Sequence, residues 1–101
     1  MVVKIYCFDL DQTLCLTDGE NYSTATPIRT RISHLNSLFF EGNIIKIFTA
    51  RGSKTGIDWR KVTEQQLLTW GVNYHELHFG KPFADVYIDD KAILDKHFFR
   101  D

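Results

Sequence analysis

Residues 2–11, VVKIYCFDLD, decide the fold, because an apolar run ends there abruptly in two aspartates. The run from Val2 to Phe8 is almost entirely β-branched, aromatic or otherwise apolar, which is typical of a strand buried on both faces. Cys7 lies within it and is predicted to be a small core residue. Asp9 and Asp11 follow directly, so we expect them where this strand ends.

The rest of the chain alternates helical and strand patterns. The helices are predicted at residues 26–41, with Thr26 as N-cap and Pro27 at the first position, at 58–70 and at 92–99. The further strands are predicted at residues 44–48, within 72–79 and at 86–88. This order predicts one α/β domain over residues 1–101: a three-layer, Rossmann-like open parallel sheet with helices on both faces.

Polar residues follow every predicted strand, and in open parallel sheets ligands bind beyond the carboxyl ends of the strands. They are Asp9 and Asp11 after the first strand, Thr49 and Arg51 after the second, Gly80 and Lys81 after the third, and Asp89 and Asp90 after the fourth. Two acidic clusters, a hydroxyl and a lysine are therefore expected at one edge of the sheet.

Several carboxylates at one edge repel each other unless a cation lies among them. Oxygen ligands without a His or Cys cluster favour Mg²⁺, which Asp9, Asp89 and Asp90 are predicted to hold. Thr49 and Lys81 would then face an anion bound to the metal, which is typical of phosphoryl transfer. Asp9 is the candidate nucleophile and Asp11 the candidate general acid and base.

Four ordered segments resemble the motifs of the haloacid dehalogenase (HAD) superfamily of phosphatases. They are FDLDQTL at residues 8–14, FTAR at 48–51, GKP at 80–82 and YIDD at 87–90. The resemblance implies that Asp9 is the nucleophile. It also implies that Asp11 is the acid/base and gives a backbone carbonyl to Mg²⁺. Thr49 and Lys81 would contact the phosphoryl group, and Asp89 would bind the metal.

Some roles stay open within this resemblance. Asp90 is either a metal ligand or a neighbour that orients the ligands. Arg51 either orients a loop or binds substrate, and with Leu10 and Ala50 it is counted among the residues that contact substrate or phosphate. The family has glycine after its second aspartate, where this chain has Gln12.

The motifs are also similar to those of small bacterial phosphatases associated with capsule and surface-polysaccharide biosynthesis. That similarity implies a phosphorylated sugar, polyol or related metabolite as substrate. The gaps at residues 14–25 and 52–71 are too short for a cap domain, so the chain is expected to be capless. Capless members either accept large substrates or use a neighbouring subunit as a lid, and we therefore expect a homo-oligomer.

The bulk properties restrict the partners. The 101 residues carry a net charge of -1, which disfavours duplex nucleic acid or an anionic membrane as the main partner. The N-terminus does not resemble a signal peptide, and no apolar stretch is long enough to span a bilayer, so the cytoplasm is expected.

Three other functions are compatible with parts of the pattern. A receiver domain also has clustered aspartates, a threonine and a lysine, but it carries its acceptor aspartate after a middle strand, where this chain has Thr49. An inactive binding protein on the same scaffold is the second. The third is a phosphatase acting on nucleotides or nucleic-acid ends, which an open site permits and the balanced charge does not favour.

Overall fold

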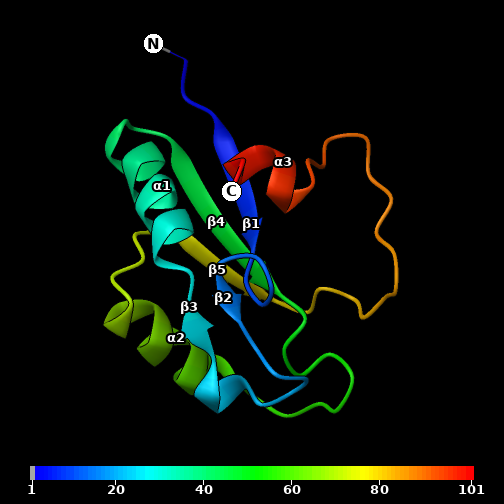
Figure 1. Ribbon diagram of the computed structural model, residues 1–101. Helices are drawn as coiled ribbons and strands as arrows, with labels where there is room; N and C mark the ends of the chain where they lie inside the picture. The colour runs from blue at the N-terminus through cyan, green and yellow to red at the C-terminus, as the bar shows by residue number, and fades with distance from the viewer. Residues whose placement is uncertain (1) are drawn as a thin grey trace.

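The computed structural model describes residues 2–101 and contains a three-stranded parallel sheet with the strand order β1-β4-β5 (Figure 1). The sheet strands are β1 (Ile5–Asp9), β4 (Ile44–Thr49) and β5 (Glu76–Phe79), and the helices are α1 (Arg29–Phe40), α2 (Arg60–Thr69) and α3 (Asp95–Phe99). A 3₁₀ turn, η1 (Tyr22–Thr24), lies between the two short antiparallel strands β2 (Cys15–Leu16) and β3 (Thr26–Pro27). The predicted α/β architecture with a parallel sheet is confirmed.

The register of the sheet brings the predicted site residues to one edge. Asp9 pairs with Phe48 across β1 and β4, and Thr49 pairs with Phe79 across β4 and β5. The three strands therefore end within one residue of the same level, and their carboxyl ends lie at one edge because the strands are parallel.

The core lies on one face of the sheet. Ile45, Ile47 and Thr49 alternate along β4 as buried residues, whereas the residues between them are only half-buried. All three helices contribute side chains to this one core: Ile32 and Leu35 from α1, Leu67 from α2, and Phe98 and Phe99 from α3.

The expectation of helices on both faces is wrong for the residues that the structure describes. On the face opposite the core, Ile5 is 61% exposed and Cys7 is exposed too. Lys46 pairs with Glu76 there, and the His78 ring lies at hydrogen-bond distance from the same carboxylate. Only six residues separate β5 from the predicted fourth strand, and a helical crossover needs a dozen or more.

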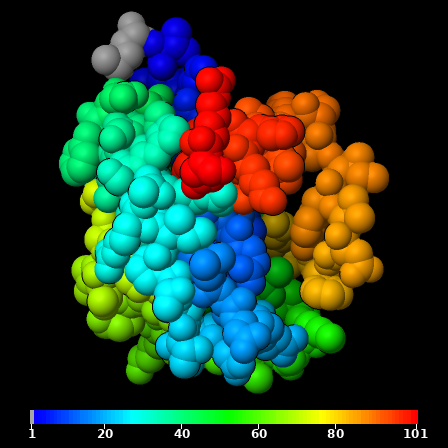
Figure 2. Space-filling model, viewed as in Figure 1, coloured from blue at the N-terminus to red at the C-terminus, as the bar shows by residue number. Residues whose placement is uncertain are grey.

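The predicted fourth strand at residues 86–88 is also absent. Residues 80–94 contain no helix or strand and run outside the sheet as a ridge beside the body of the molecule (Figures 1 and 2). Within it Val86 is 71% and Ile88 95% exposed. In the described chain β1 pairs with β4 alone, so β1 is an edge strand rather than a buried one, and Cys7 is not a core residue.

Two helices begin later in the sequence than predicted. Helix α1 begins at Arg29 rather than Pro27, because Thr26 and Pro27 pair with β2. Helix α2 begins at Arg60, whose backbone N–H donates to Asp58 Oδ1 at 3.0 Å.

Helix α3 is shorter than predicted and is held by Arg31, a buried arginine of α1. Arg31 Nη1 lies 2.6 Å from Asp95, and its Nε and Nη2 donate to the Asp101 carboxylate at 2.7 and 2.8 Å. These hydrogen bonds hold the pKa of Asp101 below its ordinary value. None of the described helices is long and apolar enough to cross a membrane.

Two neighbouring leucines in α2 test where the core lies. Leu67 is fully buried, whereas Leu68 is 74% exposed. Leu67→Ala is expected to lower the free energy of unfolding by about 2–5 kcal/mol, because it leaves a cavity. Leu68→Ala should change it by less than about 1 kcal/mol. Urea unfolding followed by circular dichroism measures both, and equal losses would contradict the one-sided core.

Candidate phosphoryl-transfer site

Asp9 lies at the end of β1 and contacts a lysine that is 72 residues away in the sequence. Lys81 Nζ lies 3.4 Å from Asp9 Oδ1, and Thr13 Oγ1 donates to Asp9 Oδ2 at 3.1 Å. The backbone N–H of Lys81 donates to the Thr49 carbonyl at 3.3 Å, which ties the lysine segment to the end of β4. The structure therefore brings Asp9 and Lys81 together with the backbone of Thr49, whereas the Thr49 side chain is buried and its hydroxyl accepts a hydrogen bond from the Arg51 backbone N–H at 3.1 Å.

The surroundings of Asp9 modify its acidity. Burial raises the pKa of the Asp9 carboxyl, and the Lys81 charge and the Thr13 hydroxyl lower it, so that the net pKa lies above the ordinary value. Lys81 itself extends over the rings of Phe48 and Tyr87, with Nζ 4.5 and 4.1 Å from their centroids. Asp9 is thus a half-buried carboxylate with a positioned cation beside it.

Thr13 was missed by the sequence reasoning. It belongs to the same FDLDQTL segment, four residues after Asp9, and the turn between them brings its hydroxyl back. The backbone of that turn is fixed by the Leu10 carbonyl, which accepts hydrogen bonds from the N–H groups of Thr13, Leu14 and Cys15. The sequence signal that could have predicted this contact is a hydroxyl residue four positions after Asp9, at the end of a tight turn.

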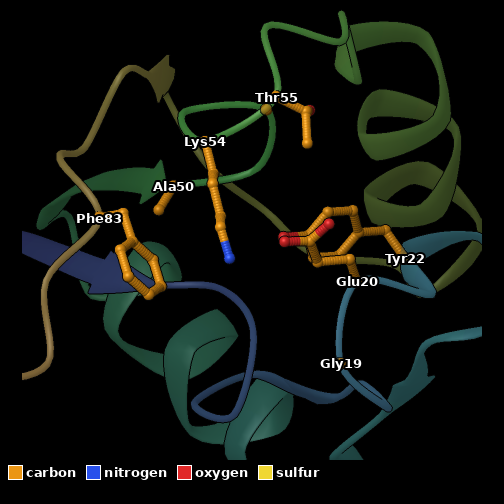
Figure 3. A pocket seen from close by; sticks show the side chains of 8 residues that line it. Gly19, Glu20, Tyr22, Ala50, Lys54, Thr55 and Phe83 are labelled. Carbon is orange, nitrogen blue, oxygen red and sulfur yellow. The ribbon is translucent and has the colours of Figure 1, made fainter.

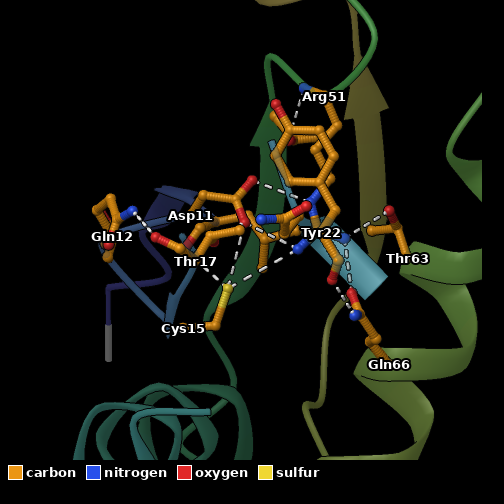
Figure 4. A network of polar contacts seen from close by, with 12 residues as sticks. Asp11, Gln12, Cys15, Thr17, Tyr22, Arg51, Thr63 and Gln66 are labelled. Carbon is orange, nitrogen blue, oxygen red and sulfur yellow. Dashed lines mark hydrogen bonds and ion pairs between the residues drawn. The ribbon is translucent and has the colours of Figure 1, made fainter. Parts of the chain in front are cut away.

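Arg51 forms a buried polar network with residues from three other segments: the turn after β1, β2 and α2 (Figure 4). Its side chain is fully buried. A guanidinium has five N–H donors. Here they meet Asp11 Oδ2 at 2.9 Å and Oδ1 at 2.8 Å, Thr63 Oγ1 at 3.0 Å, Gln66 Oε1 at 2.6 Å and Cys15 Sγ at 3.9 Å. All of its nitrogens are therefore engaged within the protein.

This geometry bears on the two interpretations of Arg51. A side chain that is fully buried and fully hydrogen-bonded has no donor left for a phosphate, so the structure favours the orienting role. Tyr22 covers the same guanidinium, with Arg51 Cζ 4.9 Å from the ring centroid.

Asp11 is held firmly as a carboxylate. Burial raises its pKa, but the hydrogen bonds from Arg51 and Thr17 and the Arg51 charge outweigh burial, and the net pKa is below the ordinary value. The Thr17 hydroxyl donates to Asp11 Oδ1 at 2.5 Å. The Asp11 side chain therefore points toward Arg51, and its use as a general acid requires that it leave this pair.

Gln12 occupies a backbone conformation that suits glycine. Its φ is 66°, in the left-handed region that side chains rarely adopt. Its Nε2 donates to the Thr17 carbonyl at 2.6 Å, and its backbone N–H donates to the Cys15 carbonyl at 2.7 Å. The turn can therefore form with Gln12, with the side chain pinned against the following segment.

The second acidic cluster is not assembled with the first. Asp89 and Asp90 lie on the exposed ridge, where Asp89 Oδ1 accepts a hydrogen bond from the Lys91 backbone N–H at 2.8 Å. Among residues 2–101 no three His, Cys, Asp or Glu side chains gather as a metal-binding group. Tyr87, two residues before Asp89, does contact Lys81. The metal roles of Asp9, Asp11, Asp89 and Asp90 stay predictions.

Leu10 and Ala50, the other two residues predicted to contact substrate or phosphate, differ in exposure. Leu10 is fully buried and its side chain belongs to the core. Ala50 lines a surface cavity together with residues of the turn before η1. Its position supports a place near a bound substrate, whereas the Leu10 side chain is remote from solvent.

Comparison with known proteins finds structural likeness only. No protein-family model matches the chain, and no curated protein is significantly similar to it. The crystal structure of an MCSG target from Vibrio cholerae is similar, with a TM-score of 0.84 and 29% identity over 96% of this chain and 88% of that one.

The fold is shared with solved proteins. Two further structures, of the Pnkp1/Rnl/Hen1 complex and of the Pnkp1/Rnl/Hen1 RNA repair complex, each have a TM-score of 0.61, with 23% and 19% identity. Each match covers 97% of this chain, but only 33% and 29% of the matched chain. The likeness therefore concerns the fold of one part of those larger chains.

The Asp11–Arg51 pair makes a pH-dependent prediction for stability. Because the folded pKa of Asp11 lies below its ordinary value of 3.8, the pair stabilises the fold fully above that pH and progressively less below it. Asp11→Asn should cost about 3 kcal/mol near neutral pH, because it leaves a buried guanidinium without its anion. The cost should shrink below pH 3.8.

Denaturant unfolding at several pH values measures this difference between wild type and variant. Asp18→Asn is the matched control, because Asp18 is exposed in the same segment and should show almost no cost. A cost for Asp11→Asn that is small, or that grows on acidification, would contradict the pairing.

Proposed function

We propose that this protein hydrolyses phosphate monoesters through an aspartyl-phosphate on Asp9. The observation that carries the proposal is the contact of 3.4 Å between Asp9 and Lys81, at the carboxyl ends of the parallel strands. A carboxylate beside a fixed cation suits attack on an anionic phosphoryl group, because the cation offsets the charge repulsion.

The proposed reaction has two steps. In the first, an Asp9 carboxylate oxygen bonds to phosphorus as the bond to the leaving oxygen breaks, and that oxygen takes a proton. In the second, water bonds to the same phosphorus, loses a proton and displaces the Asp9 oxygen, which releases inorganic phosphate. Lys81 would stabilise the oxygens of the phosphoryl group in both steps. The Thr49 hydroxyl is buried and accepts a hydrogen bond from the Arg51 backbone N–H at 3.1 Å, so its proposed part requires that a phosphoryl oxygen reach the one proton that it has left to donate.

Asp11 is proposed as the group that moves these protons. While it is paired with Arg51 it is an anion, which suits acceptance of a proton from water. To protonate the leaving oxygen, the Asp11 carboxylate must leave Arg51, take up a proton from solvent and turn toward the substrate; the proton that it accepts from water in the second step regenerates this acid. Arg51 is the proposed positioning residue that returns it to its resting orientation.

Mg²⁺ is the proposed cofactor, since the available donors are carboxylate and carbonyl oxygens, which this hard ion prefers. Asp9, the Asp11 carbonyl, Asp89 and Asp90 would hold it. When bound, it would neutralise part of the charge on the phosphoryl group. Because Asp89 and Asp90 lie on the exposed ridge, this role requires the part of the ridge that carries them to draw in toward Asp9, while Lys81 and Phe83 keep their places.

The remaining proposals concern context. We infer a sugar, polyol or related phosphate as substrate, in polysaccharide biosynthesis and in the cytoplasm. We also infer a homo-oligomer, which is supported by the uncovered sheet face with its exposed Ile5 and Cys7. A nucleic-acid end is the second candidate substrate, favoured by the likeness to structures of a Pnkp1-containing RNA repair complex.

Asp9→Asn tests the proposed function. Hydrolysis of acetyl phosphate with Mg²⁺ should fall by at least about a thousandfold, because the amide is a far weaker nucleophile. Circular dichroism should show the variant folded, and wild type should lose its activity when EDTA removes the metal. Activity that survives in Asp9→Asn would rule out Asp9 as the nucleophile, and EDTA-resistant activity would rule out the metal requirement.

A further inference from the structure

A surface cavity lies beside the proposed phosphoryl site (Figure 3). Its volume is about 310 Å³, at the lower end of the range for small-molecule sites. Its lining combines two aromatic rings, a carboxylate, an ammonium group, a hydroxyl and backbone: Gly19, Glu20, Tyr22, Ala50, Gly52, Lys54, Thr55 and Phe83. Figure 3 shows the Phe83 and Tyr22 rings on opposite sides, with the Lys54 amine directed between them.

Two residues that line the cavity are close in sequence to residues of the Asp9 site. Ala50 directly follows Thr49, and Phe83 lies two residues after Lys81. The Ser53 hydroxyl donates to the Lys81 carbonyl at 2.7 Å, so the loop after β4 is joined to the lysine segment. A phosphoryl group held by Lys81 and Thr49 would therefore have its leaving group near this cavity.

Two of the walls are rigid. Gly52 has a φ of +81°, and a Cβ there would lie 2.2 Å from the Ile57 carbonyl oxygen, so the loop after β4 requires glycine at this position. Tyr22 packs edge-on against Trp59, with ring centroids 5.0 Å apart, and covers the buried Arg51. A site with fixed walls loses less entropy when a ligand binds.

We propose that this cavity is the leaving-group subsite and that it binds the hydroxyl-bearing ring of a sugar phosphate. The inference rests on the proposed function and deepens it by assigning substrate choice to Glu20, Lys54, Tyr22 and Phe83.

The chemistry of the lining favours a polyhydroxyl ring. Hydroxyls both donate and accept, and the cavity offers an acceptor in the Glu20 carboxylate and a donor in the Lys54 ammonium group. The Tyr22 and Phe83 rings provide apolar area for the carbon skeleton. The Glu20 carboxylate would repel the additional phosphates of a nucleic-acid end and the Lys54 ammonium group would attract them, so the two charges offset each other and the choice rests on the hydroxyl-binding groups and the rings.

Substrate competition tests the subsite. The probes are a panel of pentose, hexose and heptose phosphates, a mononucleotide, an oligonucleotide with a terminal phosphate, and acetyl phosphate, whose leaving group is too small to fill the cavity. For the best sugar phosphate, the ratio of its kcat/KM to that of acetyl phosphate should fall at least about tenfold in Glu20→Gln and in Phe83→Leu. The loss should come mainly through KM.

Two matched controls distinguish the subsite from general effects. Glu41→Gln and Phe40→Leu make the same changes at exposed positions at the end of α1, and should keep the wild-type ratio. Circular dichroism should show all four variants folded.

The outcomes separate the two levels of the proposal. No hydrolysis of any probe, acetyl phosphate included, would overturn the proposed function. Hydrolysis of acetyl phosphate with an unchanged ratio in Glu20→Gln and Phe83→Leu would overturn the subsite alone. A preference for the mononucleotide or the oligonucleotide over every sugar phosphate would also overturn it.

Discussion

The buried Arg51 guanidinium is the interaction on which the architecture of the site depends. A fully buried charge is stable only when it is paired and its hydrogen bonds are satisfied. Arg51 meets this need with Asp11 from the turn after β1 and with Thr63 and Gln66 from α2. Gln66 in turn donates to the Tyr22 carbonyl at 2.6 Å. One side chain thus fixes the relative positions of the candidate acid/base, the helix and the turn that lines the cavity.

The sequence was sufficient to predict three parallel strands and the meeting of Asp9 with Lys81, but not the extent of the sheet or its uncovered face. Apolar strands that end in polar residues, separated by helical patterns, imply parallel strands whose carboxyl ends share an edge. Asp9 ends the first of these strands and Lys81 follows the third by two residues, so both are expected at that edge. Gln12 was also a useful signal, because the position where the resembling family has glycine has a positive φ here.

Other features could not be predicted, for physical reasons. An apolar run such as residues 86–88 indicates a capacity to form a strand, but pairing also depends on the length and path of the connection, which periodicity does not reveal. For the same reason, the sequence could not show that β1 is an edge strand and that Cys7 is exposed. The Asp11–Arg51 pair was hidden because several carboxylates compete for each arginine, and only the folded arrangement selects one.

The central claim is that Asp9 accepts a phosphoryl group, and trapping the phosphorylated protein tests it most directly. Acetyl phosphate with a radiolabelled phosphoryl group would be mixed with the Asp11→Asn variant, in which release should be slowed, and quenched in acid within one turnover. The account predicts label on the peptide that contains Asp9. Label on another side chain, or free phosphate released with no labelled protein at any time, would contradict it.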